Sequence, residues 1–312
     1  MIVDRQRPSR RAVHGVLLLD KPVGVSSNTA LQRAKRLYRA EKAGHTGTLD
    51  PLASGLLPVC FGAATKFSQA SLDADKAYRA TLALGITTTT GDAEGAVRRE
   101  RPVEVTREAI DAVCRRFVGT IEQLPPMHSA LKHEGRALYD YARSGIEVER
   151  TPRRVIVHAL DVVEWQGARL VLDVRCSKGT YVRTLAEDVG EALGCGAHLA
   201  ALRRTASGAL RVEDALTPEA LEALTEAGRD ARLRPADALL ADAPEWRLDE
   251  REAGRFLTGL RRRVDAADAA LLRVYGPEPR AFLGSAHITA GELIADRLLS
   301  PTEVQALIAS PP

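Results

Sequence analysis

Short apolar runs and one alternating segment predict the first strands of this chain. GVLLLD (15–20) is an apolar run suited to a buried strand, and LLPVCFG (56–62) is a second one, although it carries Pro58. KAYRATLALG (76–85) alternates instead. It places Tyr78, Ala80, Leu82 and Leu84 on one face and Arg79 and Thr81 on the other. We expect this segment to be a half-buried strand whose apolar face covers a core.

Apolar residues at helical spacing predict helices between further strands. Ser26 or Ser27 can cap a helix that runs through RAKRLYRAE (33–41). TREAIDAVCRRFVG (106–119) has a capping residue at one end and a glycine at the other, and QLPP follows it. Two more strands are expected at RRVIVHALDVVEW (153–165) and RLVLDVRCS (169–177). The order of these elements predicts an α/β (α+β) domain with a mixed β-sheet.

A later helix carries a cation where its dipole disfavours one. TYVRTLAEDVGEALG (180–194) has Thr180 available as the N-cap. Its apolar positions at helical spacing are Val182, Leu185, Ala186, Val189 and Leu193. Arg183 falls in the first turn, beside the positive end of the helix dipole, so an anionic partner should compensate it. A surface acid and a functional carboxylate both remain possible partners at this point.

The end of the chain has the pattern of a second, smaller domain. Alanine, proline and acids accumulate in RPADALLADAPEW (234–246), which indicates a linker. REAGRFLTGLRRRV (251–264) then predicts a helix, and ALLRVYG and RAFLGSAHI predict short strands. We therefore expect one domain over residues 1–240 and a small β-rich domain over residues 247–312.

Composition describes an ordinary globular protein. The chain has 312 residues, of which 45% are hydrophobic, enough to bury a core in two domains. Its four cysteines are scattered and form no CxxC pair, so neither a disulfide framework nor a zinc site is indicated. The basic N-terminus lacks the apolar core of a signal peptide, and no apolar run is long enough for a membrane span. We expect a cytoplasmic protein.

Charge is unevenly distributed along the chain. The formal net charge is only +3, but residues 1–66 hold eleven Lys and Arg against four Asp and Glu. Residues 213–312 hold twelve against eighteen. The basic end is where an anionic partner is expected to dock. Arginine outnumbers lysine 37 to 7, which suits bidentate phosphate contacts, although genome base composition can produce the same bias.

One acid stands in an unusually stiff loop, HTGTLDPLASG (45–55). Asp50 lies between two glycine-containing turns and directly before a proline. An ordinary turn explains this pattern, because Asp-Pro often starts one. A phosphate loop needs GxxxxGK followed by Ser or Thr, and a HExxH metal site needs a different spacing, so neither fits. Local pattern alone leaves Asp50 either a turn residue or a positioned carboxylate.

Five long motifs resemble one enzyme family in the same order. They are LDKPVGVSSN (19–28), GHTGTLDPLASGLLPV (44–59), KAYRATLALGITTTTGDAEG (76–95), QLPPMHSALKHEGRALYDYARSG (123–145) and CSKGTYVRTLAEDVGEALGCGAHLAALRRTASG (176–208). Together they resemble the bacterial tRNA pseudouridine-55 synthases, the TruB family. The resemblance covers roughly residues 13–210, and with five long motifs in the same order the probability of a chance match is very small.

The resemblance implies an activity and its charged residues. The family isomerises uridine 55 in the T arm of tRNA to pseudouridine, without a cofactor or a metal. By its place in GHTGTLDP, Asp50 would be the essential catalytic aspartate. Arg183 would pair with that acid and keep it ionised. Asp92, in TTTTGDAEG, would extend the charge network, and a plain turn acid before glycine is its competing interpretation.

The same resemblance implies how the target base is held. The uridine lies inside a folded tRNA arm and has to be flipped out of its stack. Tyr78 would lie against the flipped base and take part in catalysis, and His45 would fill the vacated stack. Tyr181 and Leu202 would line the uracil pocket, and Lys21 would brace the catalytic loop. Taken alone, each of these residues is as well explained by packing or by a turn.

Two alternative functions share parts of the pattern. A tRNA-binding folding chaperone would keep the RNA surface without the catalytic set. A guide-RNA-dependent pseudouridine synthase has several of the same motifs but works within a multiprotein particle. The long insert at 123–145 and the bacterial-type C-terminus favour a stand-alone enzyme with no obligatory protein partner. The C-terminal segment resembles a PUA-like RNA-binding domain, in which Arg261–Arg263 are interpreted as a solvated surface run.

Overall fold

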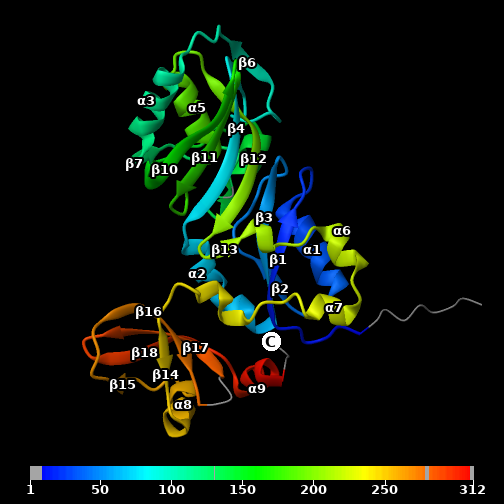
Figure 1. Cartoon of the computed structure of the whole chain (residues 1–312), viewed down its shortest axis with the longest axis vertical. Helices are drawn as coiled ribbons and strands as arrows, with labels where there is room; N and C mark the ends of the chain where they lie inside the picture. The colour runs from blue at the N-terminus through cyan, green and yellow to red at the C-terminus, as the bar shows by residue number, and fades with distance from the viewer. Residues whose placement is uncertain (1–8, 130, 278–280, 310–312) are drawn as a thin grey trace, which may run out of the picture. The chain divides into compact units, whose positions relative to one another are not determined.

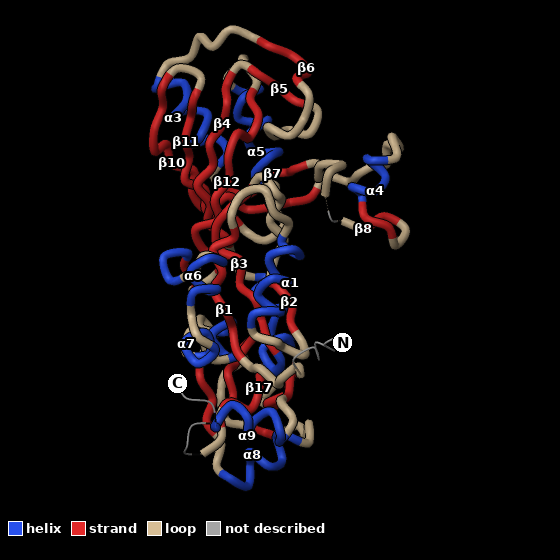
Figure 2. The backbone as a smooth tube through the Cα atoms, turned by 90° about the vertical axis from the view of Figure 1, so that its right-hand side faces the viewer, coloured by secondary structure: helices blue, strands red, loops and turns tan. Residues whose placement is uncertain are grey.

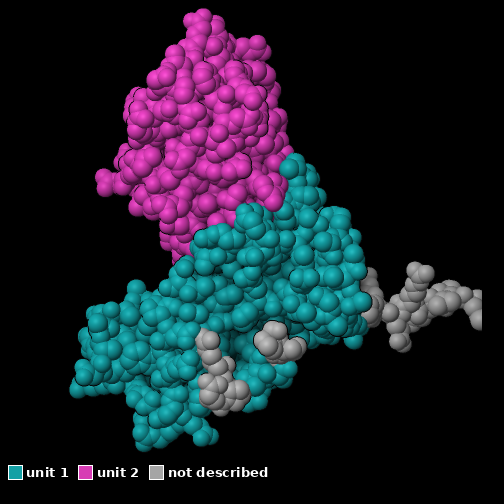
Figure 3. All heavy atoms as spheres, in the orientation of Figure 1, with its two compact units in different colours: residues 1–50, 56–72, 208–312 teal, residues 51–55, 73–207 magenta. Residues whose placement is uncertain are grey.

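The computed structural model describes residues 9–129, 131–277 and 281–309, which form two compact units. Unit 1 contains residues 1–50, 56–72 and 208–312, and unit 2 contains residues 51–55 and 73–207, as coloured in Figure 3. Both units mix helices and strands, as the sequence predicts. The division at residues 240–247 stays a prediction, since these two units are cut at other positions.

The first part of unit 1 contains the predicted strands around a capped helix. Its elements are β1 (Gly15–Lys21), α1 (Ser27–Leu37), β2 (Ala43–His45), β3 (Ala53–Phe61), η1 (Gly62–Phe67) and α2 (Ser68–Asp73). Ser26 is the N-cap of α1, and its side chain accepts from the backbone N of Thr29. The helix ends before residue 41, contrary to the sequence prediction, because Arg39 adopts a left-handed φ of 50°.

The segment after unit 2 packs more tightly than the linker expected from its composition. It contains β13 (Leu210–Arg211), η2 (Val212–Asp214), α6 (Pro218–Ala223), α7 (Glu226–Asp230) and η3 (Ala236–Leu240). Ala236, Leu239 and Leu240 of η3 are buried in a core cluster that also includes Leu56 and Phe67. Residues 236–240 are therefore part of the core of unit 1, and the prediction of a linker there is wrong.

The end of the chain is β-rich, as predicted. It contains β14 (Glu245–Arg247), α8 (Glu250–Leu257), β15 (Arg262–Arg263), β16 (Ala269–Tyr275), β17 (Phe282–Thr289), β18 (Glu292–Leu298) and α9 (Pro301–Ala309). The strands form one sheet in the order β14-β16-β17-β18-β15 (Figure 1). Lys66 Nζ donates to Glu303 Oε2 at 2.5 Å and to the Leu298 carbonyl at 3.0 Å, which ties α9 and β18 to η1.

Unit 2 is built on a central antiparallel sheet. Its strands are β4 (Lys76–Leu84), β5 (Ile86–Thr88), β6 (Val97–Glu100), β7 (Gly119–Gln123), β8 (Lys132–His133), β9 (Arg136–Ala137), β10 (Arg153–Gln166), β11 (Arg169–Cys176) and β12 (Ala197–Ser207). Its helices are α3 (Arg107–Phe117), α4 (Leu138–Arg143) and α5 (Val182–Ala192). The central order is β12-β4-β11-β10-β7. Figure 2 shows that β8 and α4 project away from this sheet.

Helices α3 and α5 cover one face of the central sheet. Ile110 of α3 and Leu185 of α5 share a buried cluster with Leu82 and Leu84 of β4. The predicted alternation of β4 is confirmed, because Ala80, Leu82 and Leu84 are buried while Arg79 is exposed. Tyr78 is less buried than the rest of its face and lies near the start of β4. Within the described ranges, no helix has the length and apolar character needed to cross a bilayer.

Candidate active site

Asp50 follows a residue that is held on both of its backbone groups. The Ser27 hydroxyl donates to the Leu49 carbonyl at 2.9 Å and accepts from the Leu49 N–H at 2.7 Å. Ser27 lies in the first turn of α1 and is buried, as is Leu49. Because Leu49 immediately precedes Asp50, this double contact limits where the carboxylate can point. The loop predicted to be stiff is fixed by a side chain 22 residues earlier.

The start of the same loop is anchored by strand pairing and by a second hydroxyl. His45 ends β2 and pairs with Val59 of β3. Thr46 is fully buried, its N–H donates to the Pro58 carbonyl, and its hydroxyl accepts from Ser71 at 2.9 Å. Gly47 then adopts a φ of 85°, which favours glycine. The loop is thus held at its start, by His45 and Thr46, and again at Leu49, directly before Asp50.

Lys21 stabilises the turn that precedes α1. It is fully buried, and its ammonium donates to the carbonyls of Pro22 at 2.9 Å and Val25 at 2.8 Å. A buried ammonium requires such partners, because an unpaired charge in the interior is costly. The turn delivers Ser27, which in turn holds Leu49. Lys21 therefore stabilises the turn before α1, and its support of the catalytic loop stays a prediction.

Beyond Asp50 the chain enters unit 2 and pairs with β12. Pro51–Gly55 belong to unit 2, and Ala53 lies in parallel register with Leu202. Gly55 has a φ of 101°, and a Cβ there would overlap the backbone carbonyl of Arg204. Only glycine permits this close approach of β3 to β12. The glycine in LDPLASG is thus explained by the close packing of β3 against the backbone of β12.

Tyr78 and Leu202 share one face of the unit 2 sheet. Leu202 of β12 is in register with Ala80, and Tyr78 is in register with Arg204, so Tyr78 and Leu202 are diagonal neighbours. Both side chains are partly exposed at the edge of the apolar cluster. A partly exposed aromatic ring beside a leucine is a surface on which a planar base can lie.

Two buried cations next to Tyr78 were not predicted. Arg204 is 1% exposed and forms a side-chain hydrogen bond with Tyr78, while burial lowers the pKa of its guanidinium. Lys76 lies two residues before Tyr78, and burial together with nearby Arg204 lowers its pKa to about 8. The sequence contained a signal for the burial of Arg204, because this residue occupies an inward position of the alternating strand in LRRTASG.

Arg183 has the anionic partner that its helix position requires. It is the second residue of α5, and its Nη1 lies 3.3 Å from Asp92 Oδ2, with both side chains almost fully buried. Its Nη2 also donates to the His128 carbonyl at 2.6 Å. Asp92 accepts further from the Thr90 hydroxyl at 2.5 Å and from the Glu94 N–H at 3.1 Å. Arg183 and Asp92 thus form a buried ion pair, and the predicted pairing of Arg183 with Asp50 stays a prediction.

The N-terminus of α5 differs from the sequence prediction. Tyr181, not Thr180, is the N-cap, and it makes no side-chain capping bond. The Thr180 hydroxyl donates instead to the Ser177 carbonyl at 2.9 Å. The buried side chain of Gln123 forms two hydrogen bonds with the backbone of Tyr181. It accepts from the Tyr181 N–H at 3.0 Å and donates to the Tyr181 carbonyl at 3.3 Å. Gln123, from QLPP, is therefore a positioning residue that the sequence pattern did not single out.

A further acid on α5 approaches the Asp92 turn. Glu187 packs so closely on Gly91 that a Cβ there would lie 2.6 Å from Glu187 Oε2. Burial, with a smaller effect of neighbouring Asp188, raises the pKa of Glu187. Nearby Arg98 and Arg183 act in the opposite direction. Glu187 thus adds a partly buried carboxyl to the surroundings of Arg183, from a position one helical turn along α5.

The predicted site residues are divided between the two units. Lys21, His45 and Asp50 lie in unit 1, whereas Tyr78, Asp92, Tyr181, Arg183 and Leu202 lie in unit 2. Within unit 2 the structure brings together Arg183 with Asp92, and Tyr78 with Leu202. Over the described part of the chain, no group of three or more His, Cys, Asp or Glu side chains is arranged to hold a metal.

Known proteins resemble this chain over nearly its whole length. A tRNA pseudouridine synthase B of Verminephrobacter eiseniae is 56% identical over 315 residues, covering 99% of this chain and 95% of that protein. The tRNA pseudouridine synthase B of Burkholderia mallei is 58% identical over 302 residues, covering 95% and 97%. The chain belongs to the TruB family of pseudouridine synthases.

Family models and solved structures agree with this membership. The TruB family pseudouridylate synthase N-terminal domain matches residues 35–182, and the tRNA pseudouridylate synthase B C-terminal domain matches residues 183–241. A third model, the C-terminal region of pseudouridine synthase II TruB, matches residues 244–299. The Cbf5 chain of a Cbf5-Nop10-Gar1 complex superposes with a TM-score of 0.72 at 26% identity, covering 93% of this chain and 86% of that one. The TruB-family fold is thus present in both parts of the chain.

Proposed function

We propose that this protein is a stand-alone tRNA pseudouridine synthase that isomerises uridine 55 in the T arm. The observation that carries the proposal is identity above 50% along the full chain with tRNA pseudouridine synthase B proteins, together with a positioned aspartate in GHTGTLDP. The reaction breaks the bond between ribose C1′ and N1 of uracil, turns the base, and joins C1′ to C5. The product is an isomer of the substrate, so no energy source is consumed.

Asp50 is assigned the essential catalytic role. The carboxylate attacks ribose C1′, takes a proton from C2′, or adds to the base, and each of these routes requires an ionised group. A fixed orientation also matters, because a detached base has to be recaptured before water intervenes. The double contact of Ser27 with Leu49 supports this assignment, since it restrains the backbone next to Asp50.

Arg183 and Asp92 are assigned to the electrostatic control of the carboxylate. A guanidinium offers several donors in a fixed plane, so one edge can serve Asp92 while another remains for a second acceptor. The 3.3 Å contact with Asp92 and the bond to the His128 carbonyl restrain Arg183. An arginine held in this way would stabilise the negative charge of the Asp50 carboxylate during the reaction.

The base-binding role falls to Tyr78, His45, Tyr181 and Leu202. We assign Tyr78 to stacking on the flipped uracil and to a late proton transfer, with its hydroxyl oriented by Arg204. Leu202 would contact the same ring from the neighbouring strand, and Tyr181 would complete the pocket. His45 would occupy the space that the uridine leaves in the tRNA stack. The substrate is therefore tRNA, and the expected compartment is the cytoplasm.

Asp50→Asn tests the proposed chemistry. This change is nearly isosteric and removes the charge, so pseudouridine formation should fall at least ~10⁴-fold, equivalent to more than ~5 kcal/mol of barrier. The dissociation constant for tRNA should stay within about tenfold, because affinity rests mainly on phosphate contacts and stacking. The measurements are pseudouridine mapping in a T-arm stem-loop and a filter-binding titration. Substantial residual product in the Asn variant would contradict the catalytic role and would show that Asp50 is a turn residue.

The guide-dependent alternative has a separate test. Purified protein incubated with a bare tRNA transcript should form pseudouridine with no other component present. Activity that appeared only after a guide RNA was added would contradict the stand-alone assignment. A binding-only chaperone would form no pseudouridine under either condition.

A further inference from the structure

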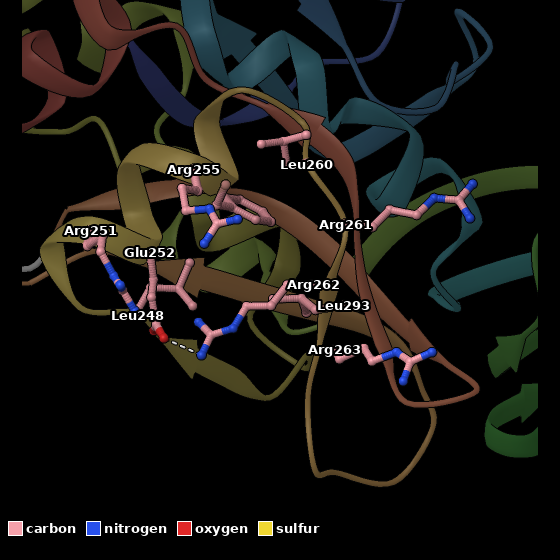
Figure 4. A pocket seen from close by; sticks show the side chains of 10 residues that line it. Leu248, Arg251, Glu252, Arg255, Leu260, Arg261, Arg262, Arg263 and Leu293 are labelled. Carbon is pink, nitrogen blue, oxygen red and sulfur yellow. Dashed lines mark ion pairs between the residues drawn. The ribbon is translucent and has the colours of Figure 1, made fainter.

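Two arginines are buried among the residues that the structure describes, Arg183 and Arg204. The other described arginines are at least partly exposed, including the five that line a pocket of the C-terminal sheet (Figure 4). Arg183 lies 3.3 Å from the carboxylate of Asp92. Arg204 forms a side-chain hydrogen bond with the phenol of Tyr78 instead. A guanidinium beside a phenol has a different chemistry from one beside a carboxylate, because the phenol is ordinarily neutral.

Tyr78 and Arg204 stand opposite each other where one face of the unit 2 sheet changes from apolar to polar. They are register partners on the antiparallel strands β4 and β12, so their side chains lie on the same face. In one direction along β4 this face carries Leu82 and Leu84, which are buried in the apolar cluster. In the other direction it carries Lys76, which is 8% exposed. The phenol thus lies at the border between an apolar core and two buried cations.

Burial of Arg204 is unfavourable for folding alone. A buried guanidinium loses its hydration, and here burial lowers its pKa. Burial, together with repulsion by Arg204, also lowers the pKa of Lys76 to about 8. An apolar side chain of similar length would pack beside the core without this cost. The hydrogen bond and the attraction between Arg204 and Tyr78 act in the opposite direction. A cation retained at a cost in stability beside an assigned site residue is a candidate for function.

The chemistry of the two groups fixes the direction of their hydrogen bond. A guanidinium has N–H donors and no acceptor, so Arg204 donates and the phenolic oxygen of Tyr78 accepts. The phenolic proton therefore points away from Arg204. A charge-assisted bond of this kind becomes stronger when the acceptor carries a negative charge. Arg204 thus favours the ionised form of Tyr78 and does not compete for its proton.

We propose that Arg204 is a positioning residue that holds the Tyr78 oxygen as an acceptor and stabilises the phenolate, which removes the proton from C5 of the rotated uracil. When C1′ has been joined to C5, that carbon still carries its hydrogen. The phenolate takes it as a proton, the electron pair of the C5–H bond forms the C5–C6 double bond, and the negative charge moves to N1. N1 then takes a proton from water and the phenol gives one back, so protons and charge balance. This inference rests on the proposed function, because it specifies the late proton transfer assigned to Tyr78.

Single-turnover kinetics of the full-length protein with a T-arm transcript, carrying either hydrogen or deuterium at C5 of the target uridine, tests the inference. Arg204→Gln should slow pseudouridine formation about ten- to hundredfold, since a positioned general base contributes about 10²–10⁴-fold. The ratio of the rates with hydrogen and with deuterium should rise above that of the wild type, because removal of the C5 proton becomes limiting. Replacement of Tyr78 by 3-fluorotyrosine, whose phenol is more acidic, should restore part of the rate in the Arg204→Gln variant.

Two further variants separate this role from packing. Arg79→Gln is the matched control, because Arg79 is the next residue on β4, is exposed, and lies 2.9 Å from Asp173. This variant loses the same charge from the opposite face of the strand and should change neither the rate nor the isotope ratio. In a Tyr78→Phe background, Arg204→Gln should have little further effect, because the phenol through which Arg204 acts is missing.

A purely structural role of Arg204 has a different signature. An isotope ratio equal to that of the wild type together with no recovery by 3-fluorotyrosine, or a full additional loss in the Tyr78→Phe background, would overturn the inference. If circular dichroism shows that Arg204→Gln does not fold, Arg204→Lys takes its place in the same measurements, because it keeps the charge but loses the planar fork, and the same changes are expected at smaller size. Failure of the proposed function has a separate readout, namely no pseudouridine formed by the wild type with either substrate.

Discussion

At the residue scale, Arg183 is the side chain whose geometry gives the sharpest kinetic expectation. Arg183→Met should lower the single-turnover rate of pseudouridine formation by several hundredfold or more if Arg183 has its proposed role, because a restrained guanidinium that stabilises a catalytic carboxylate contributes a few kcal/mol. Arg183→Lys should recover only part of that rate, since an ammonium cannot replace the planar fork. Rapid-quench kinetics at saturating enzyme measures both variants.

The Met variant should also unfold at a lower temperature. Asp92 would keep its hydrogen bonds from Thr90 and Glu94 but would lose the cation 3.3 Å away, leaving a buried carboxylate without its ion pair. Rates are therefore compared well below the melting temperature, which circular dichroism determines. Near-normal turnover in the Met variant would remove Arg183 from the site.

Glu187 gives a pH-dependent expectation at the same scale. Burial raises its pKa, so the folded protein binds this proton more tightly than the unfolded chain does. The stability that Glu187 contributes is therefore present at low pH and is lost as the pH rises through the folded pKa. The charged groups that act on it are Asp188, Arg98, Arg183 and Asp92.

Glu187→Gln should accordingly raise the melting temperature at pH 7–8 by a few degrees, with the gain shrinking towards pH 4. Glu104→Gln is the control, because Glu104 is exposed. A melting temperature that was unchanged or lower at pH 8 would show that Arg98 and Arg183 outweigh the cost of burial.

At the element scale, β3 depends on one glycine. Gly55→Ala should destabilise the fold by at least about 2 kcal/mol, because alanine disfavours a φ of 101° and its Cβ would overlap the Arg204 carbonyl. Activity should fall as well, since the displaced glycine lies five residues after Asp50. Gly254→Ala on α8 is the control, since its Cβ would meet nothing within 4 Å. It should stabilise the helix by about 0.5–1 kcal/mol. Urea denaturation measures both, and equal effects would contradict this explanation of Gly55.

Elements also show how far local pattern reaches. The caps at Ser26 and Thr106 and the alternation of β4 were predictable, because each is decided by residues within a few positions. The N-terminus of α5 was not. Its backbone is satisfied by Gln123, 58 residues away, and so the local threonine is not needed as a cap.

At the scale of unit 1, the basic excess of residues 1–66 is smaller than the sequence suggests. Arg33 pairs with Glu222 at 2.7 Å, Arg39 with Glu226 at 2.7 Å, and Arg11 forms a close pair with Asp230. The acids come from α6 and α7, which lie beyond unit 2 in the sequence. Lys35 and Arg36 form no ion pair among the residues that the structure describes.

The salt dependence of tRNA binding should reflect this pairing. Lys35→Ala/Arg36→Ala should reduce the slope of log affinity against log salt by up to about 0.7–0.9 for each phosphate that these side chains neutralise in the wild type. Arg33→Ala/Arg39→Ala, with the same change in charge, should reduce it less, because these side chains are already neutralised by glutamates. Titrations at several salt concentrations test this, and a larger effect of the Arg33/Arg39 variant would show that RNA displaces the glutamates.

The sequence by itself determined the strands, the first helices, the stiff loop around Asp50 and the family, because these depend on neighbouring residues and on motifs that stay in order. Tertiary structure decided the rest. It paired Arg183 with Asp92, buried Arg204 beside Tyr78, packed residues 236–240 into a core, and placed an acid 189 residues downstream against Arg33. Contacts between segments that are distant in the chain leave no local pattern. Each partner is a polar or charged residue that, judged by its neighbours in sequence alone, would be placed on the surface.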